Sequence, residues 1–207
     1  VSHSGGLIGS GSGSVCVVGS GSKRFTVWVY APSAKLVVMD IDGTITKSDI
    51  SGYIQTVYLG MFGYIHQGVV PFLNTLTAQF GYQVLYLTSR PIVHQTETRQ
   101  FLQGIRESGS SLPEGPLFPN KDKLMAALYR EIISKTTMQL KAKTLNAVGR
   151  VFRDAGCTRL SPFMLGVGNK EADALAYNLA GMNAQNILLI DTSSRVEVWK
   201  YQQLGKG

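Results

Sequence analysis

The sequence predicts an α/β fold with a mostly parallel sheet, and two observations carry this prediction. Four apolar runs of strand length occur along the chain, and apolar residues at helical spacing lie between them. Strands that alternate with helices are typical of a parallel sheet covered by helices. The chain has 207 residues, 44% of them hydrophobic, which is enough for one α/β domain with a buried core.

The expected strands can be placed by their patterns. Residues 24–30 alternate in the way that a half-buried strand does. Four continuous apolar runs follow, as expected for strands buried on both faces; they are residues 36–41, 84–87, 163–167 and 187–190. Residues 1–22 are rich in glycine and serine, so we expect a flexible leader there and a single domain over residues 23–207.

Four helical stripes are expected between the strands. Asn120 is a candidate N-cap for the second stripe, Lys141 is expected to open the third helix, and glycines follow the other three stripes. The stripes are Val69, Val70, Leu73 and Leu76 before Gly81; Leu124, Leu128 and Ile132; Leu145, Val148 and Phe152 before Gly156; and Leu175 and Leu179 before Gly181.

Composition narrows the environment and the partners. Two cysteines do not make a disulfide framework, and no run reaches the roughly 18 apolar residues of a membrane span. We therefore expect a protein in a reducing compartment that is soluble or lies on a membrane surface. Residues 121–159 hold nine basic and three acidic residues, so they carry six of the seven net positive charges. This stretch is either a solvated helix face or a surface for phosphates, and no motif favours nucleic acid.

Polar residues follow the apolar runs, where the carboxyl ends of parallel strands form a binding edge. Polar and acidic groups converge on this edge from at least three strands, which is hard to explain by packing, whereas Asp191 is most simply a turn residue at a strand end. The polar residues are Asp40, Asp42, Gly43 and Thr44 after the first run, Thr88, Ser89 and Arg90 after the second, Asn169 and Asp173 after the third, and Asp191 after the fourth.

The residue types at this edge suggest phosphoryl chemistry with a hard cation. Asp40 and Asp42 repel each other unless a cation such as Mg²⁺ lies between them, and Asn169 and Asp173 can add oxygen ligands. A carboxylate nucleophile can form a phosphoenzyme, and a second carboxylate can serve as general acid and base. We assign these roles to Asp40 and Asp42.

Other groups are candidates for binding the phosphate. Thr88 offers a hydroxyl, and the N–H groups near Gly43 can hold an anion. A lysine would offset the charge of the transferring phosphoryl group; Lys141 is the candidate and Lys143 the alternative. Asn169 and Asp173 remain alternatives for the direct metal ligand. Arg90 either contacts phosphate or forms a structural ion pair.

These residues resemble the four motifs of the haloacid dehalogenase superfamily, and the chain resembles the lipin family more closely still. The similarity covers residues 23–200 in unbroken order. It rests on MDIDGTITKSD at 39–49, HQG at 66–68, LYLTSR at 85–90, LPEGP at 112–116, ALYREII at 127–133 and GNKEADALAY at 168–177. The resemblance implies a Rossmann-like three-layer sandwich, the haloacid dehalogenase fold. Only residues 43–65 separate Asp42 from His66, so we expect no large cap domain.

The resemblance implies a Mg²⁺-dependent phosphatidate phosphatase that releases diacylglycerol and phosphate through an aspartyl-phosphate. It assigns Asp40, Asp42, Thr88 and Lys141 to catalysis, Gly43, Thr44, Ser89 and Arg90 to phosphate, and Asp40, Asp42, Asn169 and Asp173 to the metal. We expect a cytoplasmic protein at the anionic surface of the endoplasmic reticulum or nuclear membrane. The apolar stretch from Tyr53 to Ile65 is either core or a rim for acyl chains. A lipid-binding module with weak or no catalysis, and a phosphatase for proteins or small metabolites, are the alternatives.

Overall fold

A six-stranded sheet forms the centre of the molecule. The computed structural model describes residues 13–18, 24–47, 64–120 and 130–200. The strand order is β10-β9-β8-β3-β4-β7, and every neighbouring pair is parallel except β9 and β10. The strands are β3 (Lys35–Asp40), β4 (Tyr82–Pro91), β7 (Leu117–Asn120), β8 (Phe163–Gly168), β9 (Ile187–Ile190) and β10 (Val196–Val198). The mostly parallel sheet is confirmed.

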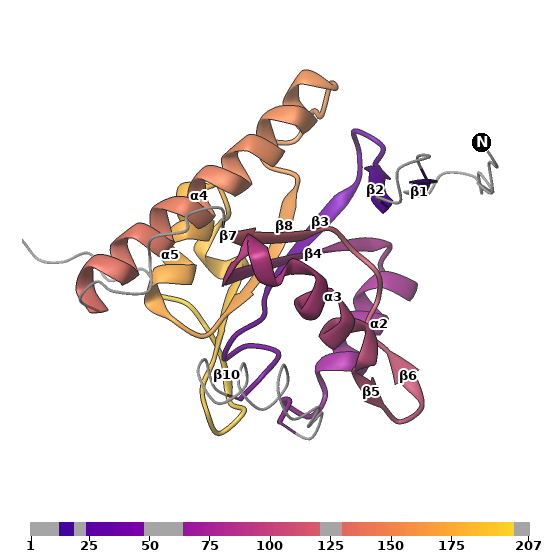
Figure 1. Ribbon diagram of the computed structural model, residues 1–207. Helices are drawn as coiled ribbons and strands as arrows, with labels where there is room; N and C mark the ends of the chain where they lie inside the picture. The colour runs from indigo at the N-terminus through magenta and orange to yellow at the C-terminus, as the bar shows by residue number, and fades with distance from the viewer. Residues whose placement is uncertain (1–12, 19–23, 48–63, 121–129, 201–207) are drawn as a thin grey trace, which may run out of the picture.

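Helices cover both faces of this sheet, which gives the expected three layers (Figure 1). They are α2 (Val69–Ala78), α3 (Gln95–Gly104), α4 (Arg130–Asp154) and α5 (Glu171–Leu179). Alternate residues of β3 enter two separate cores. Val37 and Met39 pack in the core that includes Leu73 of α2, whereas Leu36 and Val38 pack in the core that includes Leu145 of α4. Burial on both faces explains the unbroken apolar run of β3.

The stripe predicted for α2 is confirmed, but the stripe predicted for α5 is wrong at Leu179, which is 58% exposed. The buried face of α5 includes Ala174 and Tyr177 instead. In α2, Val69, Val70 and Leu73 are buried, and the chain turns at Gly81 with φ 67°. α5 is followed by Gly181 with φ 86°, a conformation that suits glycine. Residues 41–68 alone join β3 to α2, which is too short a stretch for a large cap.

The prediction of two helices between the second and third site strands is wrong where the structure can test it. Ile132 and the Leu145 stripe belong to one helix, α4, so Lys141 lies within it and does not open it. Asn120 ends strand β7. The other residues of the second stripe, Leu124 and Leu128, lie outside the described residues. Ile132 and the Leu145 stripe share one helix because neither glycine nor proline interrupts the chain between them.

The expected leader also differs from what the structure shows. Residues Gly13–Val18 form β1, which pairs antiparallel with β2 (Arg24–Val29), the strand that the alternation predicted. The only sequence signal for β1 is the short run of Val15, Cys16, Val17 and Val18. Pairing with β2 satisfies the backbone N–H and C=O groups of β1. Residues 1–12 and the proposed acyl-chain rim up to residue 63 lie outside the described residues. No helix in the described part of the chain is both long and apolar enough to cross a bilayer.

Several short elements were not predicted. They are the helix η1 (Ile92–His94), strands β7 and β10, and the hairpin of β5 (Arg106–Glu107) and β6 (Ser110–Ser111). The hairpin packs near α2, where the Glu107 carboxylate accepts the N–H groups of Gly68 at 2.6 Å and Val70 at 3.2 Å. Glu107 therefore caps the start of α2 from a distant part of the chain.

Candidate active site

The loop after β3 is held in a tight turn that orients both of its aspartates. Gly43 adopts φ 83°, which explains why glycine stands here. Its N–H group donates to Thr46 Oγ1 at 3.0 Å, and the N–H groups of Ile45 and Thr46 donate to the Ile41 carbonyl at 2.9 and 3.1 Å. The turn thus satisfies its own backbone and leaves the Asp40 and Asp42 side chains for the site.

Asp40 is buried at the end of β3, with 2% of its surface exposed. Its Oδ1 lies 2.5 Å from Lys141 Nζ, and its Oδ2 accepts the Thr44 hydroxyl at 3.0 Å. Lys141 Nζ also lies 2.6 Å from Asp173 Oδ1. One ammonium from α4 therefore links carboxylates that follow β3 and β8. Thr44, expected near the phosphate, donates its hydroxyl to the nucleophile candidate.

Two carboxylates share one ammonium in this cluster, and burial together with these charges shifts the pKa values of Asp40 and Lys141. Burial raises the pKa of Asp40 to about 7, although the Lys141 charge opposes this shift. Burial by itself would lower the pKa of Lys141, but the carboxylates of Asp173 and Asp40 raise it well above its usual value. Lys141 is therefore a permanent cation, and the cluster lacks one positive charge.

Asp42 belongs to a second cluster, formed with β4. Its Oδ2 accepts the Thr88 hydroxyl at 2.7 Å, and its Oδ1 lies 2.9 Å from Arg90 Nε and 2.8 Å from Arg90 Nη2. The backbone N–H of Arg90 donates to Thr88 Oγ1 at 3.0 Å. Arg90 therefore forms an ion pair, one of the two interpretations that the sequence left open, and it does so inside the site.

Helix α3 supports Arg90 from behind, a role that the sequence did not reveal. Arg90 Nη1 lies 3.5 Å from Thr98 Oγ1, and the Arg90 guanidinium carbon lies 5.4 Å from the centre of the Phe101 ring. Thr98 and Phe101 are buried. Their helical spacing would have been the only signal, since one polar and one aromatic residue a turn apart are common in any helix.

Asn169 and Asp173 form the third part of the site, where β8 leads into α5. Asp173 Oδ2 accepts the N–H groups of Asn169 at 3.2 Å and Lys170 at 3.1 Å. The Asn169 carboxamide lies 3.3 Å from both the Asp42 carbonyl and Asp173 Oδ2 in the orientation that turns its nitrogen toward them. With the opposite orientation, three oxygens face one another, as they do around a bound cation.

The side-chain oxygens of the four predicted metal ligands do not all point to one place. Among the described residues, no group of three or more histidine, cysteine, aspartate or glutamate side chains is arranged to hold a metal. The Asp42 carboxylate faces Thr88 and Arg90. The Asp42 oxygen that lies beside the Asn169 carboxamide is therefore the backbone carbonyl. Sequence reasoning missed this carbonyl, because a backbone atom leaves no trace in a motif of side chains.

The remaining predicted residues are placed less centrally. Ser89 is exposed and lines a small groove of about 20 Å³ with Thr88 and Lys141. Lys143, the alternative lysine, is exposed on α4. Asp191 accepts the N–H groups of Ser193 at 2.8 Å and Arg195 at 3.0 Å, as expected for a turn residue.

His66 is a buried residue beside the loop of Asp42. It is 1% exposed, its N–H donates to the Ile45 carbonyl at 3.0 Å, and its Nδ1 lies 2.8 Å from Ser194 Oγ. Burial lowers the pKa of His66, so it is neutral at pH 7. It connects the loop of Asp42 to the turn between β9 and β10.

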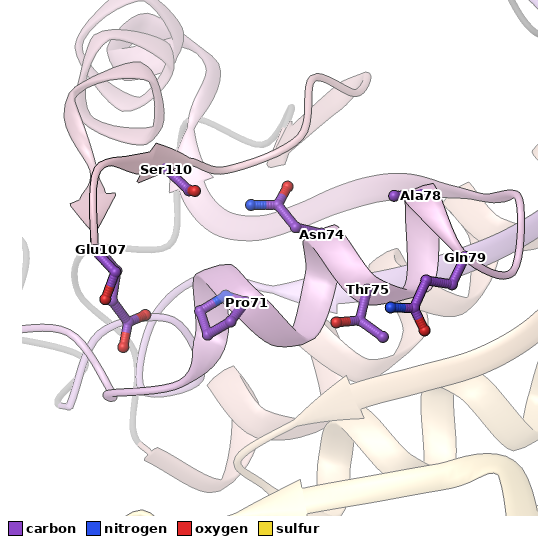
Figure 2. Close-up of a pocket in the computed structure, with 8 residues that line it drawn as sticks. Pro71, Asn74, Thr75, Ala78, Gln79, Glu107 and Ser110 are labelled. Atoms are coloured by element: carbon purple, nitrogen blue, oxygen red, sulfur yellow. The ribbon is translucent and has the colours of Figure 1, made fainter.

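A larger groove lies elsewhere, between α2 and the β5–β6 hairpin (Figure 2). Its volume is about 300 Å³, and its polar lining includes Asn74, Gln79 and Glu107. No residue of the three site clusters lines it, so it is separate from the chemistry described above.

This parallel sheet, with an aspartate pair after its central strand and a lysine and second acidic loop beside it, has the arrangement of the haloacid dehalogenase fold. The profile of LNS2 (Lipin/Ned1/Smp2) matches residues 15–206, and the chain belongs to this family. The match begins inside the expected leader, in agreement with strand β1.

Similar proteins point the same way. The chain is 36% identical to Phosphatidic acid phosphohydrolase 1 of Saccharomyces cerevisiae over 185 residues, which are 86% of this chain and 20% of that protein. It is 36% identical to Nuclear elongation and deformation protein 1 of Schizosaccharomyces pombe over 170 residues, 82% of this chain and 25% of that protein. It is 32% identical to Phosphatidate phosphatase LPIN1 of Homo sapiens over 166 residues, 80% of this chain and 18% of that protein. The chain thus spans a quarter or less of these relatives.

Proposed function

We propose that this chain is a Mg²⁺-dependent phosphatidate phosphatase that works through an aspartyl-phosphate. The names of the relatives in Saccharomyces cerevisiae and Homo sapiens support the substrate. The observation that carries the chemistry is the Asp40–Lys141–Asp173 cluster: a buried carboxylate at the carboxyl edge of the sheet, oriented by an ammonium and by the Thr44 hydroxyl. Such a carboxylate is positioned to act as a nucleophile.

In the first step, an Asp40 oxygen forms a bond to phosphorus while the bond between phosphorus and the glycerol oxygen breaks. Asp42 supplies the proton that the departing oxygen needs, so diacylglycerol leaves as a neutral alcohol. In the second step, Asp42 accepts a proton from water, whose oxygen attacks phosphorus. The bond between phosphorus and the Asp40 oxygen breaks, so phosphate is released and the Asp40 carboxylate is restored.

The contacts of Asp42 suggest how phosphate binding prepares this step. Thr88 and Arg90 are hydrogen-bonded to Asp42, and both are typical phosphate donors. Phosphate oxygens would compete with Asp42 for these two side chains. Binding of the substrate thus frees the Asp42 carboxyl group to turn to the leaving oxygen.

The residues fit a magnesium ion. The Asp40 cluster lacks one positive charge, and the Asn169 carboxamide, the Asp42 carbonyl and the Asp173 carboxylate converge beside it. We propose that Asp40, the Asp42 carbonyl and Asn169 hold the ion, while Asp173 orients Asn169 and Lys141. The bound ion would neutralise charge on the phosphoryl group during transfer.

We propose that the enzyme acts at an anionic membrane surface of the endoplasmic reticulum or nucleus, where phosphatidate is embedded. Exposed basic residues of α4 support this placement: Lys143, Arg150 and Arg153. Basic side chains near an anionic leaflet strengthen peripheral binding.

The test is phosphate release from phosphatidate in detergent micelles, with and without Mg²⁺, beside the Asp40→Asn variant. We expect Mg²⁺-dependent release that the variant lacks, and a phosphoenzyme that acid quenching traps only in the wild type. Hydrolysis by Asp40→Asn would contradict the mechanism. Activity on a soluble aryl phosphate but none on phosphatidate would favour another substrate, and binding of phosphatidate without any turnover would favour a lipid-binding module.

A further inference from the structure

Exposed aliphatic side chains lie at the edge of the sheet that carries the site. β4 ends at Pro91, and η1 begins at Ile92. Ile92 is 41% exposed and Val93 is 65% exposed. Single apolar residues are ordinary on a protein surface, so their position decides what they mean. These two follow Arg90, whose guanidinium contacts Asp42, with Pro91 alone between.

The turn of Pro91, Ile92 and Val93, here called the apolar turn, is held firmly against the site. Arg90 before it contacts both Asp42 and Thr98. The Thr98 hydroxyl in turn donates to the carbonyl of His94, directly after the turn, at 2.8 Å. Arg90 and Thr98 thus anchor the residues on either side of the apolar turn next to the site.

We propose that the apolar turn inserts into the bilayer that carries the substrate, an inference that rests on the proposed function. The phosphate of a bilayer lipid lies close to its acyl chains, so Asp40 can reach it only when this edge of the sheet is pressed to the membrane. Aliphatic side chains on that edge then leave water for the apolar interior.

The charge at the same edge agrees with this partner. Lys170 is exposed at the start of α5, directly after Asn169. A basic side chain at the same edge of the sheet as the apolar turn suits a surface of anionic lipid, where the ammonium stays among headgroups and the aliphatic groups go deeper. The groove of Figure 2 lacks this combination, because its lining includes the Glu107 carboxylate.

The test compares Ile92→Ser/Val93→Ser with Phe80→Ser in the full chain. Phe80 is 58% exposed and precedes β4, so it lies at the opposite end of the same strand. Binding to phosphatidylcholine vesicles that contain phosphatidate is measured by flotation, with all proteins also carrying Asp40→Asn to prevent turnover. We expect about tenfold weaker binding for the double variant, since it loses two aliphatic groups that would be partly buried in the bilayer. Phe80→Ser should bind like its parent.

A second comparison uses active enzyme. Hydrolysis of a soluble aryl phosphate should be unchanged in the double variant, whereas hydrolysis of phosphatidate in vesicles should fall by about the same tenfold factor. Unchanged vesicle binding would overturn the proposal, and so would an equal loss in Phe80→Ser. If the wild type hydrolyses no phosphatidate even in micelles, the proposed function fails, but the flotation result still stands as the test of the surface.

Discussion

Lys141 Nζ lies 2.5 Å from Asp40 Oδ1, although α4 and β3 are distant in sequence. Both side chains are buried, with 6% and 2% of their surfaces exposed. The pair explains why a lysine is needed inside the domain, since Asp40 and Asp173 would otherwise be buried without a counter-charge. Removing one partner of such a pair leaves an uncompensated charge.

Lys141→Met should therefore abolish activity and lower the free energy of unfolding by about 3–5 kcal/mol in EDTA, measured by urea denaturation. Lys143→Met is the matched control, because Lys143 is exposed on the same helix. Its effect should stay within about 0.5 kcal/mol. Equal effects of the two substitutions would contradict the assignment of Lys141.

The raised pKa of Asp40 predicts a pH dependence of stability in the absence of metal. The pKa of about 7 in the folded state exceeds the usual aspartate pKa of 3.8, so the folded state holds the Asp40 proton more tightly than the unfolded state does. The contribution of Asp40 to stability is thus full below about pH 4 and is lost as the pH rises toward 7. The free energies of unfolding of the wild type and of Asp40→Asn are measured in EDTA from pH 4 to 8. The wild type should lose stability relative to Asp40→Asn as the pH rises. A difference that does not change with pH would contradict this pKa.

The guanidinium of Arg90 contacts several groups with different nitrogens, so we expect that a positive charge alone is not sufficient at this position. Arg90→Lys keeps the charge but loses the planar group that contacts Asp42, Thr98 and Phe101, so kcat/KM should fall by about tenfold or more. Arg99→Lys is the control. Arg99 is a partly exposed residue of α3, so this variant should retain full kcat/KM. Steady-state kinetics on an aryl phosphate measures both, and wild-type kinetics for Arg90→Lys would refute a phosphate-binding role.

The proposed metal site can be tested without any measurement of turnover. Mg²⁺ should raise the melting temperature of the wild type, because a ligand of the folded state stabilises it. Asn169→Ala should lose most of this increase, whereas Asn146→Ala, on the exposed face of α4, should keep it. An undiminished increase in Asn169→Ala would exclude that carboxamide as a ligand.

Two glycines should respond oppositely to alanine. A Cβ atom on Gly168 would lie 2.6 Å from the Asp173 Cβ, so Gly168→Ala should displace Asp173, reduce activity and cost about 1–3 kcal/mol of stability. A Cβ atom on Gly149, within α4, would meet the flexible end of Arg153 at 3.3 Å. Gly149→Ala should be neutral or stabilising by up to about 1 kcal/mol, because glycine is a poor helix former. Urea denaturation distinguishes the two, and a neutral Gly168→Ala would show that the loop can relax.

The sequence by itself determined the parallel sheet and the edge at which the site residues gather. Strands buried on both faces require unbroken apolar runs, and the polar residues that end those runs must lie together because the strands are parallel. The runs that became β3, β4, β8 and β9 were therefore recognisable. The extent of α4 was not, because its apolar stripe alone did not show where the helix begins.

Only the tertiary structure decided how the side chains at this edge pair. Asp42 faces Arg90 and Thr88, whereas Asp40 faces Lys141, although the two aspartates are near neighbours in one motif. Their directions depend on the turn at Gly43 and on cations brought from β4 and α4. The Asp42 carbonyl beside Asn169, and the support that α3 gives to Arg90, likewise arise from packing between segments far apart in the chain, and local sequence patterns do not encode such contacts.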